Sequence, residues 1–384
     1  MSSEVAADTA DQYVVGGVDS HADTLHVAVI SDNGGHLADA EFTTTAAGYA
    51  AALAFLDAHG QVIAVGVEGT SSYGAGFTSA ARSHGHAVVE VNRPDRAERR
   101  RIGKSDPIDT YAAARAALSG RASSTPKDAT VAGIRALHNA TRSAVKARTA
   151  ALNQITHILF TAPETIRARF RHLNGTDRTD ALARLRPAGD TVHVAVLTAL
   201  KSLARRVKEL TAEREELTRA LDREVTAHNP GLRAAYGVGP DTAAQLLVTA
   251  GGNPERMRTE ASFAALCGDR GANAALYRIA LVRMAGGYRT REYVARQTAA
   301  GRTKKEIIRL LKRAIVREMF RCLTTTVTVP HIADLRPLRQ SKNITLTAAA
   351  RYFGLWPTAI SNLERGLRRD DELASAYRDW LSAA

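Results

Sequence analysis

Four acidic residues in the first third of the chain are the strongest candidates for chemistry. Asp19 ends the first apolar run, Glu68 ends a later one, and Asp106 and Asp109 stand three residues apart at the start of an Ala-rich helix. Carboxylates at strand ends gather along one edge of a sheet, and a spacing of three places two residues on one helix face. Oxygen ligands suit Mg²⁺, and two such ions about 4 Å apart promote phosphoryl transfer. The sequence therefore predicts a two-ion Mg²⁺ site formed by all four acids.

Each acid alone has a simpler interpretation. An Asp after a strand commonly forms a turn, and Asp106 before Pro107 fits a helix N-cap with proline at the first helical position. The preceding segment favours a site, because cations can hold a phosphodiester beside carboxylates that bind metal. The nucleic-acid contacts expected there are Arg93, Arg96, Arg99, Arg100, Arg101 and Lys104.

Residues 13–122 have the pattern of an α/β domain. Two short apolar runs come first, and an Asn-Gly turn at 33–34 links the second of them to a third strand, which predicts a hairpin. Further apolar runs at 61–67 and 86–91 alternate with helical segments. This order predicts a mixed sheet with flanking helices, which would bring the strand ends that carry the acids together.

Residues 126–229 look entirely helical. From 191 to 228, apolar residues recur every three or four positions, which is typical of a heptad seam with one Arg in it. Two interpretations stay open. The helix packs on its own domain, or it is a coiled-coil arm that pairs between subunits and makes the protein a homo-oligomer.

The composition favours a nucleic-acid partner. The 52 Lys and Arg residues exceed the 39 acids and give a net charge of +13, which suits a polyanion, although ribosomal and membrane-surface proteins are basic too. Only two cysteines occur, so a disulfide framework or a cysteine zinc site is not expected. No stretch of 18 apolar residues predicts a membrane span. We expect a protein of the cytoplasm.

Several motifs resemble one known family. The segments occur in order at 17–25, 67–74, 91–94 and 104–109, and they are similar to successive motifs of the insertion sequence 110 family of transposases. The resemblance implies a ribonuclease-H-like domain, similar to the Holliday-junction resolvase RuvC, with an Asp-Glu-Asp-Asp (DEDD) tetrad. On that match the tetrad is Asp19, Glu68, Asp106 and Asp109. The resemblance covers about residues 13–325 and also implies DNA as substrate and a structured guide RNA. It further implies a bacterial protein associated with the nucleoid.

Residues 231–328 form a third, mostly helical part. The Gly-rich turn with Gly237 and Gly239 is similar to a helix-hairpin-helix motif, in which backbone N–H groups contact a phosphate. This part resembles the family's C-terminal transposase domain at 262–268 and 273–283. Between these segments the family carries about twenty residues with a serine nucleophile, but here Gly268 runs almost directly into Asn273. We assign no serine nucleophile, since Ser262 lies outside that motif.

Residues 331–384 form a fourth part that resembles the helix-turn-helix of phage-repressor-like regulators. Thr345 or Thr347 can cap a helix that ends before Gly354, and a second helix starts at Pro357. In that geometry the second helix enters the major groove of DNA, whereas the alternative is a small bundle for protein contacts. The expected base-reading side chains are Thr358, Ser361, Asn362 and Arg365.

Three hypotheses follow for function. The first is a Mg²⁺-dependent transposase that cleaves and exchanges DNA strands, impaired in recombination because its serine segment is missing. The second is a degenerate member that acts as a DNA-binding regulator through its last domain. The third is a junction resolvase that works without a serine step.

Overall fold

The computed structural model describes residues 12–91, 106–122, 124–126, 131–251, 257–329, 331–366 and 370–383. It divides into two compact units. The N-terminal unit comprises Met1–Thr130 with Gly251–Arg256, and the helical unit comprises Val131–Ala250 with Met257–Ala384. Within the described residues, no helix is both long enough and apolar enough to cross a membrane.

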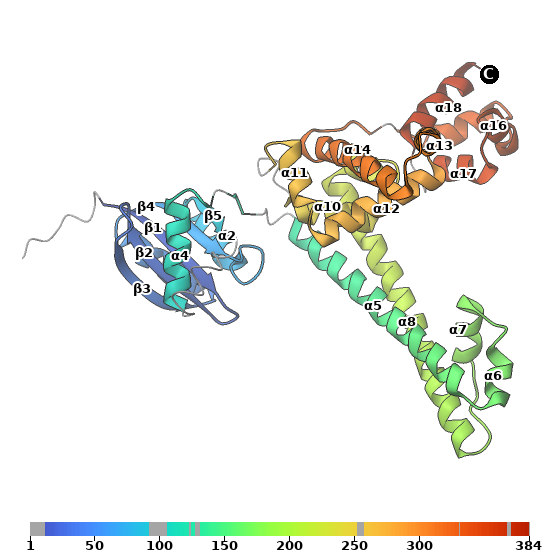
Figure 1. The fold of residues 1–384 in the computed structure, drawn as a ribbon, viewed down its shortest axis with the longest axis horizontal. Coiled ribbons are helices and arrows are strands. Elements are labelled where there is room, and N and C mark those ends of the chain that lie inside the picture. Colours follow the sequence, from blue (N-terminus) through green and yellow to red (C-terminus); the bar gives the residue numbers. More distant parts are fainter. Residues whose placement is uncertain are drawn as a thin grey trace, which may run out of the picture. The chain divides into compact units, whose positions relative to one another are not determined.

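A five-stranded mixed sheet forms the centre of the N-terminal unit, as the sequence predicted (Figure 1). The strand order is β3-β2-β1-β4-β5. β1 is antiparallel to β2 and β2 to β3, whereas β4 is parallel to both of its neighbours. The strand bounds are β1 Tyr13–Ser20, β2 Thr24–Ser31, β3 His36–Thr43, β4 Gln61–Glu68 and β5 Val88–Val91.

The β2–β3 turn is held by local hydrogen bonds. The Ser31 hydroxyl donates to the side-chain oxygen of Asn33 over 2.6 Å, and the Gly35 N–H donates to the Ser31 hydroxyl over 3.0 Å. Gly34 has φ 88°, a backbone conformation that favours glycine. The expected hairpin between the second and third strands is therefore present, with the turn residues fixing its register.

Helices cover both faces of the sheet. Helix α1 (Ala46–Asp57) and helix α2 (Ala75–Ser83) pack on one face, where Val14 and Val18 of β1 lie in their core. Helix α4 (Asp106–Leu118) packs on the other face, against Val15 and residues of β2 (Figure 1). Successive residues of β1 therefore point alternately to the two layers, as the two-residue period of a strand requires.

Two long helices dominate one half of the helical unit. Helix α5 (Ala132–Thr161) and helix α8 (Thr191–His228) pack side by side and run antiparallel (Figure 1). Their core also holds the short helices α6 (Glu164–Phe170) and α7 (Gly175–Ala183). Packing within one chain thus accounts for much of the apolar seam of α8, since Leu200 and Val207 are buried in this core and Leu221 is buried in the larger core of the helical unit. Pairing between subunits stays a prediction.

The ends of α5 and α8 join a helical body with one large core. Helix α14 (Lys304–Thr324) begins with a capping box between Thr303 and Glu306 and buries an apolar stripe against this core. The other helices of this body are α9 Pro230–Ala234, α10 Pro240–Ala250, α11 Glu260–Leu266, α12 Arg270–Gly286 and α13 Tyr288–Ala299.

The last described segment consists of four short helices with a core of their own. Thr345 caps the second helix by accepting a hydrogen bond from the Ala348 N–H over 3.1 Å, and Gly354, with φ 63°, makes the turn before the third. The helices are α15 Leu335–Ser341, α16 Leu346–Tyr352, α17 Pro357–Glu364 and α18 Asp371–Ala383.

Candidate active site

Two of the predicted acids lie side by side on parallel strands. Val18 of β1 pairs with Val67 of β4, so Asp19 and Glu68 occupy the next position on each strand. Neighbouring strands are about 4.8 Å apart. Both acids follow a paired glycine by two residues, since Gly17 pairs with Gly66, and they therefore point to the same face of the sheet.

Helix α4 lies directly on that face because both glycines lack a side chain. A Cβ on Gly17 would lie 2.0 Å from the carbonyl oxygen of Thr110, and one on Gly66 would lie 2.5 Å from that of Ala113. Ala114, one turn after Thr110, packs with Val15, so the helix runs antiparallel to β1. Its first turn consequently lies over the strand positions that carry the acids.

Asp109 completes this arrangement from the helix. It precedes Ala113 by one turn and so shares the sheet-facing stripe of α4, displaced from Gly66 toward Glu68. Asp109 is only 3% exposed, and the Asp19 side chain is 16% exposed. The backbone thus places three acids, two of them largely withdrawn from water, on the facing surfaces of the sheet and the start of α4.

The donor set of this site fits a hard divalent cation. Carboxylates held near one another disfavour each other's charged form, and a bound divalent cation removes that repulsion. The imidazole of His21 also reaches the site, with its Nε2 3.7 Å from Asp19 Oδ2, and it is half-exposed. The residues that could hold a metal here are therefore Asp19, Glu68 and Asp109, with His21 at the rim.

Two parts of the predicted site are less defined. Asp106 is the first residue of α4, one turn before Asp109, and its side chain lies outside the described residues. The basic segment also lies outside the described residues, with all of its predicted DNA contacts: Arg93, Arg96, Arg99, Arg100, Arg101 and Lys104. These assignments stay predictions.

A comparison with known families agrees with this geometry. Residues 16–163 match the family model of the DEDD transposase of insertion sequence 110, described as a transposase. This segment is a DEDD transposase domain of the insertion sequence 110 family. The match covers nearly all of the sheet, α4 and the whole of α5, so the matched segment includes the elements that carry Asp19, Glu68 and Asp109. No curated protein matches the chain.

Beyond the matched segment, the Gly-rich turn precedes helix α10. Gly237 has φ 80°, and the Arg283 side chain packs against it. Arg283 Nε donates to the Tyr236 carbonyl over 2.8 Å, while its other two nitrogens bind Glu318 at 2.6 and 2.9 Å. The Gly239 N–H donates to Thr242 Oγ1 over 2.9 Å, so this donor is used within the turn. Phosphate binding by the turn stays a prediction.

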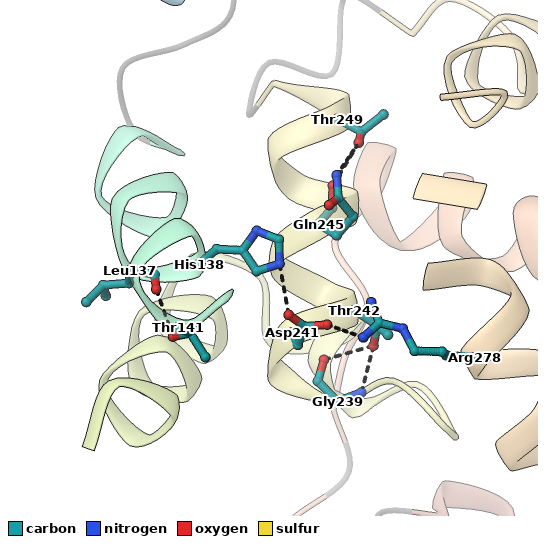
Figure 2. Close-up of polar contacts among 9 residues, drawn as sticks. All are labelled: Leu137, His138, Thr141, Gly239, Asp241, Thr242, Gln245, Thr249 and Arg278. Atoms are coloured by element: carbon teal, nitrogen blue, oxygen red, sulfur yellow. Dashed lines mark hydrogen bonds and ion pairs between the residues drawn. The ribbon is translucent and has the colours of Figure 1, made fainter. Parts of the chain in front are cut away.

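A partly buried polar network ties the start of α10 to two other helices (Figure 2). His138 of α5 is 3% exposed, and its Nε2 lies 2.9 Å from Asp241 Oδ1. Arg278 of α12 binds the other oxygen of Asp241 at 2.5 Å. The hydrogen bond from His138, and then the charge of Arg278, lower the pKa of Asp241. The network stabilises the packing of α10 between α5 and α12.

The predicted gap in the C-terminal part corresponds to a very short connection. Helices α11 and α12 are joined by Cys267, Gly268 and Asp269, and Asp269 caps α12 by accepting from the Gly271 N–H over 2.9 Å. The Ser262 hydroxyl donates to the Thr259 carbonyl over 2.7 Å as part of the capping box of α11. Ser262 therefore has a local structural role.

The predicted base-reading residues all lie on α17 or directly after it. Thr358 and Arg365 are exposed, and Ser361 and Asn362 are half-buried. Trp356, which precedes the helix, is 79% exposed. The four side chains are thus at least partly accessible, and their contact with DNA stays a prediction.

Sequence reasoning missed several residues that the structure brings together. His21 lies two residues after Asp19, and that spacing was the available signal. Asp57, His84 and His86 converge elsewhere on the N-terminal unit, and the His-x-His pattern was the only local sign of this. Nothing in the local sequence pointed to the pairing of His138 with Asp241, which are 103 residues apart.

Proposed function

We propose that this protein is a transposase that cleaves DNA strands with divalent metal held by Asp19, Glu68, Asp106 and Asp109. The observation that carries the proposal is the convergence of Asp19, Glu68 and Asp109 under the start of α4 within a DEDD transposase domain. A bound pair of Mg²⁺ ions would supply activation of the attacking oxygen and stabilisation of the leaving oxygen. The surplus of basic residues supports DNA as the substrate.

The chain's own residues have separable roles in this proposal. Asp19, Glu68 and Asp109 hold cations on a rigid base, because two of them come from adjacent strands and the third from a helix seated on those strands. His21, at 3.7 Å from Asp19, orients that carboxylate. The arginines of 93–101 and Lys104 would hold the phosphodiester. The match to the family further supports a guide RNA and a homo-oligomer as partners to be tested.

Strand joining is expected to be impaired. Covalent exchange needs a nucleophile that holds the phosphoryl group between breakage and joining. The three-residue connection between α11 and α12 supports the absence of the serine segment, and the hydroxyl of Ser262 is engaged in a helix cap. We therefore propose cleavage without efficient exchange, and a phosphoserine-linked DNA intermediate would contradict this part of the proposal.

A DNA-binding regulator is the second candidate function. It is favoured by the four-helix segment α15–α18, which has its own core and carries Thr358 and Arg365 exposed on or beside α17. In this case the acidic site would be a remnant, and binding to DNA would not require a metal.

One experiment separates the two candidates. Labelled single-stranded, duplex and branched DNA is incubated with the full chain and Mg²⁺ or Mn²⁺, and strand cleavage is followed for wild type, Asp19→Ala and the control Asp23→Ala. The transposase proposal predicts metal-dependent cleavage that is lost only in Asp19→Ala. DNA binding without cleavage by wild type would favour the regulator, and cleavage confined to branched DNA would indicate a junction resolvase.

A further inference from the structure

Three metal-ligating side chains meet on the N-terminal unit away from the acidic site. Asp57 is the last residue of α1, His84 ends α2, and His86 stands just before β5. Each offers one ligand atom, and these atoms all lie within 4.8 Å of one another. Val91 of β5 pairs with Glu68, and His86 lies five residues before Val91. The cluster is therefore roughly 16 Å from Glu68 along the strand direction.

The spacing of the donor atoms is close to that of a metal site. His84 Nε2 lies 2.9 Å from Asp57 Oδ2, and His86 Nε2 lies 3.2 Å from Asp57 Oδ1. Tetrahedral Zn²⁺ with bonds of about 2.1 Å separates its ligand atoms by about 3.4 Å. The two contacts, which go to different oxygens of Asp57, are within about 0.5 Å of that separation, and one ligand atom from each of the three residues lies within 4.8 Å of the others.

The backbone fixes both histidines before any ion binds. The Gly85 N–H donates to the Arg82 carbonyl over 3.1 Å, and the His86 N–H donates to the Ala81 carbonyl over 3.0 Å. With Gly85 at φ 99°, these two bonds form a Schellman motif at the end of α2. The motif holds the imidazole-bearing residues on either side of the glycine, so little chain entropy is lost on binding.

His86 provides an independent sign of a missing ligand. Its side chain is only 12% exposed, and its buried Nε2 forms no well-aligned hydrogen bond among the described residues, although Asp57 Oδ1 lies 3.2 Å away. Buried polar atoms normally have a partner. A metal ion at this nitrogen would supply the missing partner.

We propose that Asp57, His84 and His86 bind a Zn²⁺-class transition-metal ion, with water in the fourth position. Two imidazoles and one carboxylate suit such an ion, whereas Mg²⁺ prefers oxygen ligands alone. The ion would join the end of α1 to the α2–β5 connection and so stabilise the helical layer on that face of the sheet. This site is separate from the acidic site and does not rest on the proposed function.

Cobalt binding tests this proposal directly. The tag-free full chain is stripped with a chelator and titrated with Co²⁺, whose visible absorption reports tetrahedral ligation, and Zn²⁺ affinity and thermal stability are measured in parallel. We expect one tight equivalent per chain and a rise in melting temperature with Zn²⁺. His84→Ala, at a half-exposed position, should weaken binding by at least about tenfold and abolish the rise.

Matched variants keep the result interpretable. His172→Ala removes an exposed histidine of the helical unit and should bind as wild type does. His86→Ala should behave like His84→Ala. Binding that is unchanged in both His84→Ala and His86→Ala, or no tight Co²⁺ equivalent in wild type, would overturn the proposal and leave a hydrogen-bonded His–Asp cluster only.

Discussion

Gly17 of β1 and Thr110 of α4 are in direct backbone contact, since a Cβ on Gly17 would lie 2.0 Å from the Thr110 carbonyl oxygen. The contact sets the height of α4 above the sheet, and Asp109 is the residue before Thr110. The position of Asp109 relative to Asp19 therefore depends on Gly17, which lies two residues before Asp19 and has no side chain. This relationship links a packing feature to the geometry of the acidic site.

Gly17→Ala should lift α4 from the sheet. We expect the free energy of unfolding of the N-terminal unit to fall by about 3 kcal/mol. This is the upper end of the cost of overpacking, because the added methyl group clashes with backbone. Hydrogen exchange of the α4 and β1 amides, followed by mass spectrometry, measures it. Gly16→Ala is the control on the opposite face, where the added atom meets the flexible end of Leu56 at 2.8 Å. Equal protection of these amides from exchange in Gly17→Ala and Gly16→Ala would contradict the proposed role of the contact.

The Asp241 network should make the α10 junction acid-sensitive. The pKa of Asp241 is lowered from its ordinary value of 3.8, so the ionised carboxylate stabilises the fold above about pH 4, and that contribution is lost as the pH falls through the lowered pKa. Wild type should therefore exceed Asp241→Asn in unfolding free energy by a constant amount from pH 5 to 7. The difference should shrink below pH 4 in urea titrations, and a difference that grows there would refute the assignment.

A buried ion pair should control the stability of the α15–α18 segment. Arg339 Nε donates to Glu364 Oε1 over 2.6 Å, and the Tyr377 hydroxyl donates to the same oxygen over 2.8 Å. The Glu364 side chain is 2% exposed, so Glu364→Ala leaves a buried cation and should cost about 3–5 kcal/mol.

The control for this pair is more exposed. Asp334 and Arg378 form an ion pair of the same segment whose side chains are 43% and 31% exposed, and Arg378→Ala should cost about 1 kcal/mol or less. Hydrogen exchange of the α17 amides reports both variants. Similar losses of amide protection in Glu364→Ala and Arg378→Ala would show that the buried pair contributes no more stability than the more exposed pair.

Arg365 should contribute to DNA binding by the same segment. It is exposed directly after α17, and Arg365→Ala should weaken binding by about 1–3 kcal/mol if the residue reads a base, without changing stability. Arg336→Ala removes the same charge from the exposed surface of α15 and serves as control. Filter binding on a selected DNA pool at fixed salt measures both, and equal losses would indicate non-specific electrostatics instead.

The sequence was sufficient to predict the mixed sheet of the N-terminal unit. Alternating apolar runs, an Asn-Gly turn and helical spacing are local signals, and they predict a mixed sheet with flanking helices, which is what the structure contains. They also predict that Asp19 and Glu68 end their strands. How closely α4 approaches was not predictable, because Gly17 and Gly66 show their role only once Thr110 and Ala113 lie above them.

Other features depend on pairing across long separations. The seam of α8 has the same pattern whether its partner is α5 or a second chain, so the sequence left both interpretations open. Arg339 and Glu364 are 25 residues apart, and no local pattern predicted the pairing that permits their burial. Asp57 and His84 are 27 residues apart, and only the fold of α1 onto α2 brings them together.

Metal binding at the acidic site tests the central claim most directly. Electron paramagnetic resonance counts Mn²⁺ bound to the full chain of wild type, Asp19→Asn, Asp109→Asn and the control Asp23→Asn, which alters an exposed residue of the β1–β2 turn. His84→Ala is introduced throughout to remove the second proposed site. The account predicts bound Mn²⁺ in wild type and the control, and a loss of at least about tenfold in affinity in each of the other two variants. Undiminished Mn²⁺ binding by Asp109→Asn would contradict a shared cation site.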